Sequence, residues 1–339
     1  MEFPTDRHGL IHRSAALTVG LTDTDLVRAC RRGDLTRVIR GVYVASSRRT
    51  PEEVHRLRAI ASVQMEQVDR VRSVVSPVRS EQVVVDSDAA VEVGAGVRAA
   101  MSRTVLSHQS AAAVHGLSML KPNFRRVHFT TREKSGGYRT PSRHVHVGGA
   151  DDVVETDGIR MTSLARTAVD VACSTTMGFA GALTVFDSAL RLGADREAMG
   201  EMLRGRRKGV GVARRALHHA DGLAENPGES WSRAQMIEAG FPVPRLQHEF
   251  FDGAGDFVAR TDFDRSGLLV GEFDGKAKYR KNLRPGETPL DALQREEERE
   301  DALRRLGIMV IRWTWDDLEH GRLVGMIRDW LVRLRLLAA

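Results

Sequence analysis

The sequence predicts a multidomain α/β (α+β) fold. A chain of 339 residues is longer than one average domain, and its 42% of hydrophobic residues is enough for more than one buried core. Two helix patterns followed by a hairpin pattern open the chain. Farther along, the pattern becomes helix, three strands, helix, strand and helix, which is typical of a layered unit. We therefore expect three regions: residues 1–50, 51–222 and 223–339.

Composition narrows the class of protein. The net charge of +6 and the pI of about 9.7 are compatible with a polyanionic partner such as DNA, without requiring one. Cys30 and Cys173 form no Cys-x-x-Cys pair, so neither a zinc site nor a disulfide framework is expected. The sequence shows no signal-peptide pattern, and no run approaches the roughly 18 apolar residues of a membrane span. We expect a cytoplasmic protein with no membrane partner.

The first region combines two helices with a hairpin. Residues 14–19 are short and apolar, and residues 22–32 begin with capping residues and end before a glycine. Residues 35–39 and 42–44 are β-rich runs separated by an Arg-Gly turn. These are the elements of a small winged helix-turn-helix, whose second helix enters the major groove of DNA.

Five arginines of this region are the candidate DNA contacts. They are Arg28, Arg31 and Arg32 on the second helix, and Arg37 and Arg40 on the hairpin. In a winged helix, the hairpin arginines would meet phosphates. The alternative is a solvated amphipathic helix with ordinary surface arginines, and the sequence leaves both interpretations open.

The second region mixes helices and strands. Helices are expected over residues 51–72, 109–114, 161–173, 179–192 and 196–203, and strands over 127–130 and 144–147. His108 and His115 lie seven residues apart. A helical metal pair prefers the closer i,i+4 spacing, so we interpret both histidines as capping and packing residues.

The last region carries the residues with the clearest chemistry. Helices are expected over residues 229–239, 289–306 and 323–337, and strands over 246–250, 257–263, 268–273 and 308–313. Asp262 lies on one strand, and Glu272, Asp274 and Lys276 lie on the next. Alternate side chains of a strand share a face, so the last three lie together if the strand continues. Carboxylates gathered at a strand pair can bind a hard divalent cation and orient water against a phosphodiester.

In a metal-dependent nuclease, these residues would serve as metal ligands and as a cation that stabilises the transition state. Asp262 and Glu272 would ligate Mg²⁺, for which Mn²⁺ can substitute, with Asp274 as a further ligand. The metal would lower the pKa of a bound water, and Lys276 or Lys278 would stabilise the charge that develops on the phosphoryl group. The alternative is that both acids lie at exposed strand ends and bind only water.

Three segments resemble the AbiEi-family antitoxin-like proteins of actinobacteria. They are GDLTRVIRGVYV (33–44), LSHQSAAAVHGL (106–117) and MTSLARTAVDVA (161–172), in the family's order. The resemblance implies an N-terminal winged helix followed by an α/β region, DNA binding, and autoregulation of a toxin–antitoxin operon. It also implies a nucleotidyltransferase-like toxin as partner. The chain has no nucleotidyltransferase signature of its own, so it corresponds to the antitoxin-like member.

Residues 226–335 resemble the Vsr-like branch of the PD-(D/E)XK nuclease fold, a restriction-endonuclease-like mixed sheet flanked by helices. That branch carries an acid on its first helix, an aspartate on the second strand and an acid on the third. By this resemblance the metal ligands are Glu229, Asp262 and Glu272. Glu229 also fits the third position of a helix capping box, which is its alternative role.

The nuclease motif departs from the family pattern at its lysine. If Glu272 is the motif acid, Asp274 takes the lysine position, whereas Asp274-Gly275-Lys276 keeps an intact D-x-K with Glu272 as an extra acid. Lys278 could supply the cation from a shifted position. The resemblance thus implies a Mg²⁺-dependent endonuclease, and the alternative is an antitoxin-like repressor with a catalytically dead nuclease fold.

Overall fold

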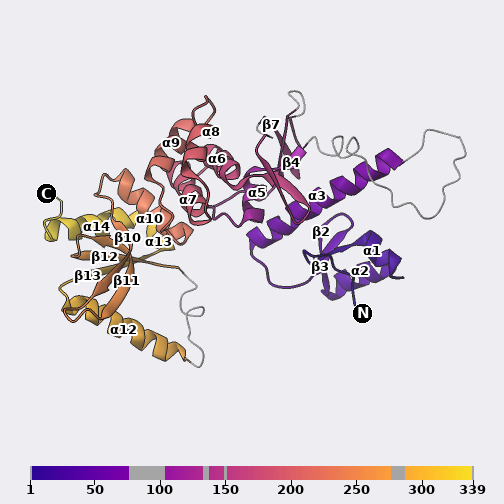
Figure 1. Cartoon of the computed structure of the whole chain (residues 1–339). Helices are drawn as coiled ribbons and strands as arrows, with labels where there is room; N and C mark the ends of the chain where they lie inside the picture. Colours follow the sequence, from indigo (N-terminus) through magenta and orange to yellow (C-terminus); the bar gives the residue numbers. More distant parts are fainter. Residues whose placement is uncertain (1, 76–103, 133–136, 149–150, 276–286, 338–339) are drawn as a thin grey trace, which may run out of the picture. The chain divides into compact units, whose positions relative to one another are not determined.

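The structure, a computed structural model, describes residues 2–75, 104–132, 137–148, 151–275 and 287–337 (Figure 1). The chain forms two compact units: residues 1–117 with 122–170, and residues 118–121 with 171–339. Helices and three separate sheets alternate along the described residues, which confirms the predicted α+β multidomain class. None of the described helices combines the length and apolar character that a membrane span requires. The division into three regions stays a prediction.

The N-terminal residues form a small sheet with two helices. The elements are β1 (Leu10–His12), α1 (Arg13–Thr18), α2 (Asp23–Arg32), β2 (Leu35–Ile39) and β3 (Val42–Ala45), with strand order β1-β3-β2 and antiparallel pairing. Thr22 caps α2, since its hydroxyl accepts the Asp25 N–H while the Asp25 carboxylate accepts the Thr22 N–H. Gly33 ends the helix at a φ of 81°, a conformation that favours glycine. The helices and hairpin match the predicted segments, and β1 is an addition.

The rest of the first unit is built on a six-stranded sheet. Its elements are α3 (Pro51–Val75), β4 (Thr104–Leu106), α5 (His108–His115), β5 (Val127–Thr131), β6 (Tyr138–Arg139), β7 (Arg143–Val147), β8 (Val153–Thr156), β9 (Ile159–Thr162) and α6 (Leu164–Ser174). The strand order is β6-β7-β5-β4-β9-β8, with β4–β9 and β5–β7 parallel. Leu10 and Val42 of the small sheet join the buried cluster of α3 and this larger sheet.

One predicted boundary in this unit is wrong. The helix expected over residues 161–173 begins only at Leu164, because Met161 belongs to β9 and pairs with Leu106 of β4. The Met161 side chain is buried in the core of the sheet, and this long-range pairing has no local sequence signal.

The second unit consists of a helical part and a four-stranded sheet. Its elements are α7 (Gly178–Arg191), α8 (Arg196–Met202), α9 (Val210–His219), α10 (Pro227–Glu238), β10 (Arg245–Phe251), β11 (Phe257–Arg265), β12 (Leu269–Asp274), α12 (Pro289–Arg305), β13 (Met309–Thr314), α13 (Trp315–Glu319) and α14 (Arg322–Arg333). The strand order is β10-β11-β12-β13, with only β12 and β13 parallel among these four. The mixed sheet matches the expected element order.

Alternate side chains of β12 pack in two different buried clusters, as the two-residue period of a strand predicted. Leu269 and Phe273 pack in the cluster that contains residues of α10 and α14, whereas Val270 packs with Leu303 of α12. Gly271 is required on the first face, because a Cβ there would overlap the ring of Trp313. The even-numbered face of β12 therefore points toward α12.

Candidate functional site

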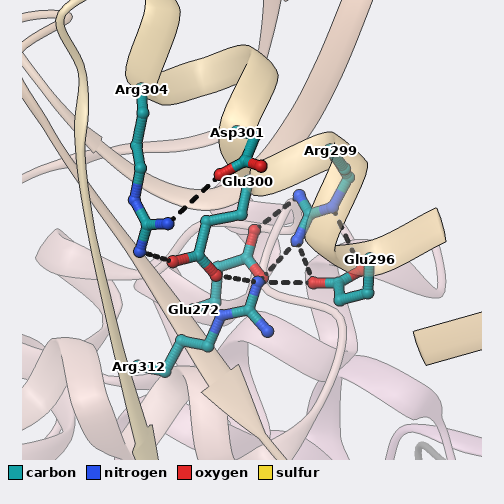
Figure 2. Close-up of polar contacts among 7 residues, drawn as sticks. All are labelled: Glu272, Glu296, Arg299, Glu300, Asp301, Arg304 and Arg312. Atoms are coloured by element: carbon teal, nitrogen blue, oxygen red, sulfur yellow. Dashed lines mark hydrogen bonds and ion pairs between the residues drawn. The ribbon is translucent and has the colours of Figure 1, made fainter. Parts of the chain in front are cut away.

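Glu272 lies on β12 and is held by an arginine of α12. Its side chain is only 6% exposed. Both carboxylate oxygens accept hydrogen bonds from Arg299, at 2.7 Å for Nη1–Oε1 and 2.6 Å for Nη2–Oε2 (Figure 2). Such a bidentate, charge-assisted pair is among the stronger polar contacts in proteins. The carboxylate expected to ligate a cation is thus an ion-pair partner in this structure.

Arg299 belongs to a larger network of alternating charge (Figure 2). Its Nε donates to Glu296 at 3.1 Å, and Arg312 of β13 donates to Glu296 at 2.6 Å and approaches Glu300 at 3.0 Å. Burial opposes the charge on Arg299, but the hydrogen bonds with Glu272 and Glu296 outweigh it and raise the pKa of the guanidinium. Burial likewise favours the neutral form of Glu296, and the two arginines outweigh it and lower the pKa of that carboxyl. The network joins β12, β13 and α12.

Asp262 lies on β11, beside the end of β12. The antiparallel pairing of β11 with β12 ends at Phe263 opposite Gly271, so Asp262 and Glu272 are the first residues beyond the paired segment. Asp262 Oδ2 accepts the backbone N–H of Phe273 at 2.9 Å, just beyond the last paired residues. It takes part in further contacts as well. The structure therefore brings the two acids to neighbouring strands, with Asp262 engaged by the sheet backbone.

Glu229 lies in the first turn of α10 and is 3% exposed. Its Oε2 accepts the Glu225 N–H at 2.7 Å and the Gln247 amide at 3.3 Å, and the Asn226 side-chain amide donates to its other oxygen. Asn226 in turn caps the helix by accepting the N–H groups of Gly228 and Glu229. These contacts tie Glu229 to the residues that precede and cap α10, but they do not include the Asn226 backbone N–H, whose bond to the carboxylate would complete the capping box.

The three expected metal ligands do not form a common cluster. In the described part of the chain, one group of three or more His, Cys, Asp or Glu side chains brings its ligand atoms within 4.8 Å of one another, and it consists of histidines. Asp274 is half-buried at the end of β12 and has contacts of its own. Lys276 and Lys278 lie outside the described residues, so the lysine position of the motif has no described geometry.

The histidine group lies on two parallel strands of the first unit. His128 of β5 pairs in register with His144 of β7, and His146 follows on the same face. His128 Nδ1 lies 3.0 Å from His146 Nε2. Burial lowers the pKa of His128 to about 3 and that of His146 to about 4, and it also lowers the pKa of His144. The sequence prediction missed this group, although His-x-His on a strand places both rings on one face.

The five arginines expected to contact DNA are all exposed. Arg28, Arg31 and Arg32 extend from α2, Arg37 lies on β2, and Arg40 lies in the hairpin turn. Arg32 pairs with Asp34 at 2.9 Å. Among the described residues, the other four have no carboxylate oxygen within 4.0 Å of their guanidinium nitrogens. Their charge is therefore available to an anionic ligand.

A cavity of about 1020 Å³ in the same unit is rich in arginine. Its charged lining residues are Arg13, Arg37, Arg40, Arg58, Arg143, Asp23 and Glu66. Arg13 is neutralised by Asp23 through two bonds of 2.6 Å, and Arg143 by Glu66 at 2.8 Å. The remaining arginines give the cavity an excess of positive charge.

Comparison with protein families finds no match. Two similar proteins are an uncharacterized protein of Mycobacterium tuberculosis strain CDC 1551 / Oshkosh and an uncharacterized protein of strain ATCC 25618 / H37Rv. Each is 34% identical over 184 residues, which cover 52% of this chain and 63% of the relative. The matched part of this chain therefore spans less than two thirds of each relative's length. Neither name states an activity, so the functional conclusion depends on the geometry.

Proposed function

We propose that this chain is a duplex-DNA-binding protein of the antitoxin-like regulator type, in which the C-terminal sheet is a non-catalytic scaffold. The observation that carries the proposal is the set of exposed arginines on α2 and the β2–β3 hairpin that, among the described residues, have no carboxylate oxygen within 4.0 Å. A guanidinium is always charged, and its planar donors match phosphate oxygens. An unpaired guanidinium can bind a phosphate without first breaking an ion pair.

The order of elements around these arginines supports duplex DNA as the anion. In a winged helix, the second helix enters the major groove and the hairpin contacts the backbone. Here α2 carries Arg28 and Arg31, and the hairpin carries Arg37 and Arg40. Arg37 and Arg40 also line the positively charged cavity. Phosphate contacts from the hairpin and base contacts from α2 would together fix the register on DNA.

The state of the acidic residues supports a scaffold rather than a nuclease. Mg²⁺ requires oxygen ligands that converge on one point in near-octahedral geometry. Glu272 instead accepts two charge-assisted hydrogen bonds from Arg299. Asp262 accepts a backbone N–H of β12, and Glu229 accepts the backbone N–H of Glu225, just before α10. Each carboxylate already has protein donors and joins two parts of the fold.

A salt-dependent binding measurement tests the DNA proposal. Fluorescence anisotropy with a duplex from upstream of the gene and an unrelated duplex, between about 50 and 200 mM salt, should give a steep fall in affinity. The double variant Arg37→Ala, Arg40→Ala should reduce the magnitude of the slope of log K against log salt by about two, since each phosphate contact contributes about 0.9. The matched control, Arg260→Ala with Arg304→Ala, removes two exposed arginines of the second unit and should leave both quantities unchanged. Equal binding by the wild type and the hairpin variant would contradict the proposal.

The second candidate is a Mg²⁺-dependent endonuclease, favoured by the positions of Asp262 and Glu272 on adjacent strands, just beyond the paired part of β11 and β12. It predicts cleavage of duplex, nicked, mismatched or single-stranded DNA in Mg²⁺ or Mn²⁺, abolished in Asp262→Ala. Identical behaviour of wild type and variant on all four substrates would remove this candidate. The nucleotidyltransferase-like toxin that the AbiEi resemblance implies remains a proposed partner, to be tested by co-purification with the product of a neighbouring gene.

A further inference from the structure

Four histidines of the first unit lie against one another, on β5, β7 and the start of α5. The rings of His144 and His146 have centroids 3.7 Å apart, and His108 stacks on His146 at 3.7 Å with planes 13° apart. His128 closes the group through its 3.0 Å contact with His146. The ligand nitrogens of His128, His144 and His146 all lie within 4.8 Å of one another.

The spacing fits a shared ion. Two nitrogens bound to one tetrahedral Zn²⁺ lie about 3.3 Å apart, given Zn–N distances of about 2.0–2.1 Å. The 3.0 Å separation of His128 Nδ1 and His146 Nε2 is close to that value. The two nitrogens share a hydrogen bond, so the ring that donates it must move this proton away before both can bind an ion. His144 Nε2 lies 3.4 Å from Nη2 of Arg139, an exposed side chain that can turn into solvent when an ion binds.

The surroundings hold the rings in place. His108 begins α5 at a φ of 50°, a conformation that non-glycine residues rarely adopt. Its Nδ1 lies 2.9 Å from Ser107 Oγ, which accepts a 2.7 Å bond from the Thr130 hydroxyl. Backbone strain that the surroundings maintain is a recurrent property of functional sites. The backbone conformation of His108 places its ring against His146, and this stacking restricts the orientation of the His146 ring.

We propose that His128, His144 and His146 form a binding site for a divalent transition-metal ion of the Zn²⁺ class, with His108 as a positioning residue. Imidazole nitrogen suits Zn²⁺, Co²⁺, Ni²⁺ and Cu²⁺ better than Mg²⁺ or Ca²⁺, which prefer oxygen. Three protein ligands are the number found in zinc sites that keep a position open for water or a ligand. The absence of a Cys-x-x-Cys pair does not exclude this site, because its ligands are histidines.

Isothermal titration of tag-free, chelator-treated protein with Zn²⁺ tests the proposal, with Co²⁺ absorption as a second readout. We expect one equivalent of Zn²⁺ to bind and Co²⁺ to give the strong visible bands of tetrahedral coordination. The double variant His144→Gln, His146→Gln should bind at least about tenfold more weakly, since even outer-shell changes cost 10–100-fold. The matched control is His218→Gln with His219→Gln, a histidine pair on α9 of the second unit, and it should bind as the wild type does.

Circular dichroism of each variant separates ligand loss from unfolding. His144 is the least buried of the three ligands, so the single variant His144→Gln serves if the double variant fails to fold. Wild-type protein that takes up no equivalent of Zn²⁺, or a folded His144→Gln variant that binds with unchanged affinity and Co²⁺ spectrum, would overturn the proposal. Tighter binding of Mg²⁺ than of Zn²⁺ would overturn the metal class.

Discussion

Replacing Arg299 by alanine should destabilise the second unit through the carboxylate that it leaves behind. The variant removes both hydrogen bonds to Glu272, whose side chain is 6% exposed, and the two to Glu296. A carboxylate that loses its partner in a buried site retains the cost of desolvation without the compensating attraction. The effect is therefore expected to exceed that of a surface ion pair.

The magnitude follows from the geometry of the pair. Removing one partner of a buried ion pair costs about 3–5 kcal/mol. Arg299 is 22% exposed, and Arg312 lies 3.8 Å from Glu272, so water and a second guanidinium can compensate part of the loss. We expect a decrease in the free energy of unfolding at the lower end of that range, about 3 kcal/mol. Arg304→Ala, an exposed arginine on the same helix, should cost less than about 1 kcal/mol.

Urea denaturation followed by tryptophan fluorescence is a suitable assay. All four tryptophans, residues 231, 313, 315 and 330, lie in the second unit, so their emission reports that unit and not the first. A double-mutant cycle with Glu272→Gln then isolates the pair, and the double variant should lose about 2 kcal/mol less than the sum of the single losses. Strict additivity, or an Arg299→Ala cost no larger than that of Arg304→Ala, would refute the reasoning.

Three further outcomes follow from buried groups. Burial lowers the pKa of His128 to about 3 and that of His146 to about 4, so the unfolded state binds more protons below pH 6.5. In the presence of a chelator, stability should fall as the pH drops from 6.5 toward 4, by about 1.4 kcal/mol per pH unit for each ring, and His128→Gln should remove its share of that slope. Gly271→Ala forces a methyl group into the Trp313 ring and should cost about 1–3 kcal/mol in urea denaturation. Arg233→Met leaves Asp187 buried without its 2.6 Å partner and should cost about 3–5 kcal/mol, measured in the same way.

A specific result would contradict each of these three predictions. A pH slope that is unchanged in His128→Gln would show that another group dominates acid destabilisation. Gly275→Ala is the control for Gly271, because a Cβ at residue 275 would meet only ordinary contact with Phe273. Equal free energies of unfolding of the two alanine variants in urea would contradict the packing explanation. Wild-type-like stability of Arg233→Met would show that Asp187 takes up a proton once the arginine is removed, a step that burial makes less costly because it already raises the pKa of Asp187 to about 6.

Local signals in the sequence predicted much of the fold. The Thr22 cap, Gly33 and the Arg-Gly turn of the hairpin were read from neighbouring residues, and the structure places α2, β2 and β3 where those signals predicted them. Glu272 and Phe273 lie on opposite faces of β12, as the two-residue period of a strand predicted from the sequence. Short strands such as β9 escaped prediction, since their existence depends on a partner far away in the chain.

The state of the candidate sites was less predictable. Nothing near Glu272 in the sequence identifies Arg299 as its partner, because the two meet only when α12 folds back over β12. The Arg299 side chain is only 22% exposed, although its helix is rich in charged residues. The histidine group depends on the parallel pairing of β5 with β7, which joins His128 to residues 16 and 18 positions away.

The placement of β13 has a consequence for biosynthesis. β13 pairs with the whole of β12 from Leu269 to Asp274, yet it is translated after α12. Until the ribosome has delivered residues through Thr314, β12 is an open edge whose backbone N–H and C=O groups can pair with a strand of another nascent chain. This protein should therefore depend on chaperones most strongly during the interval between the synthesis of these two strands.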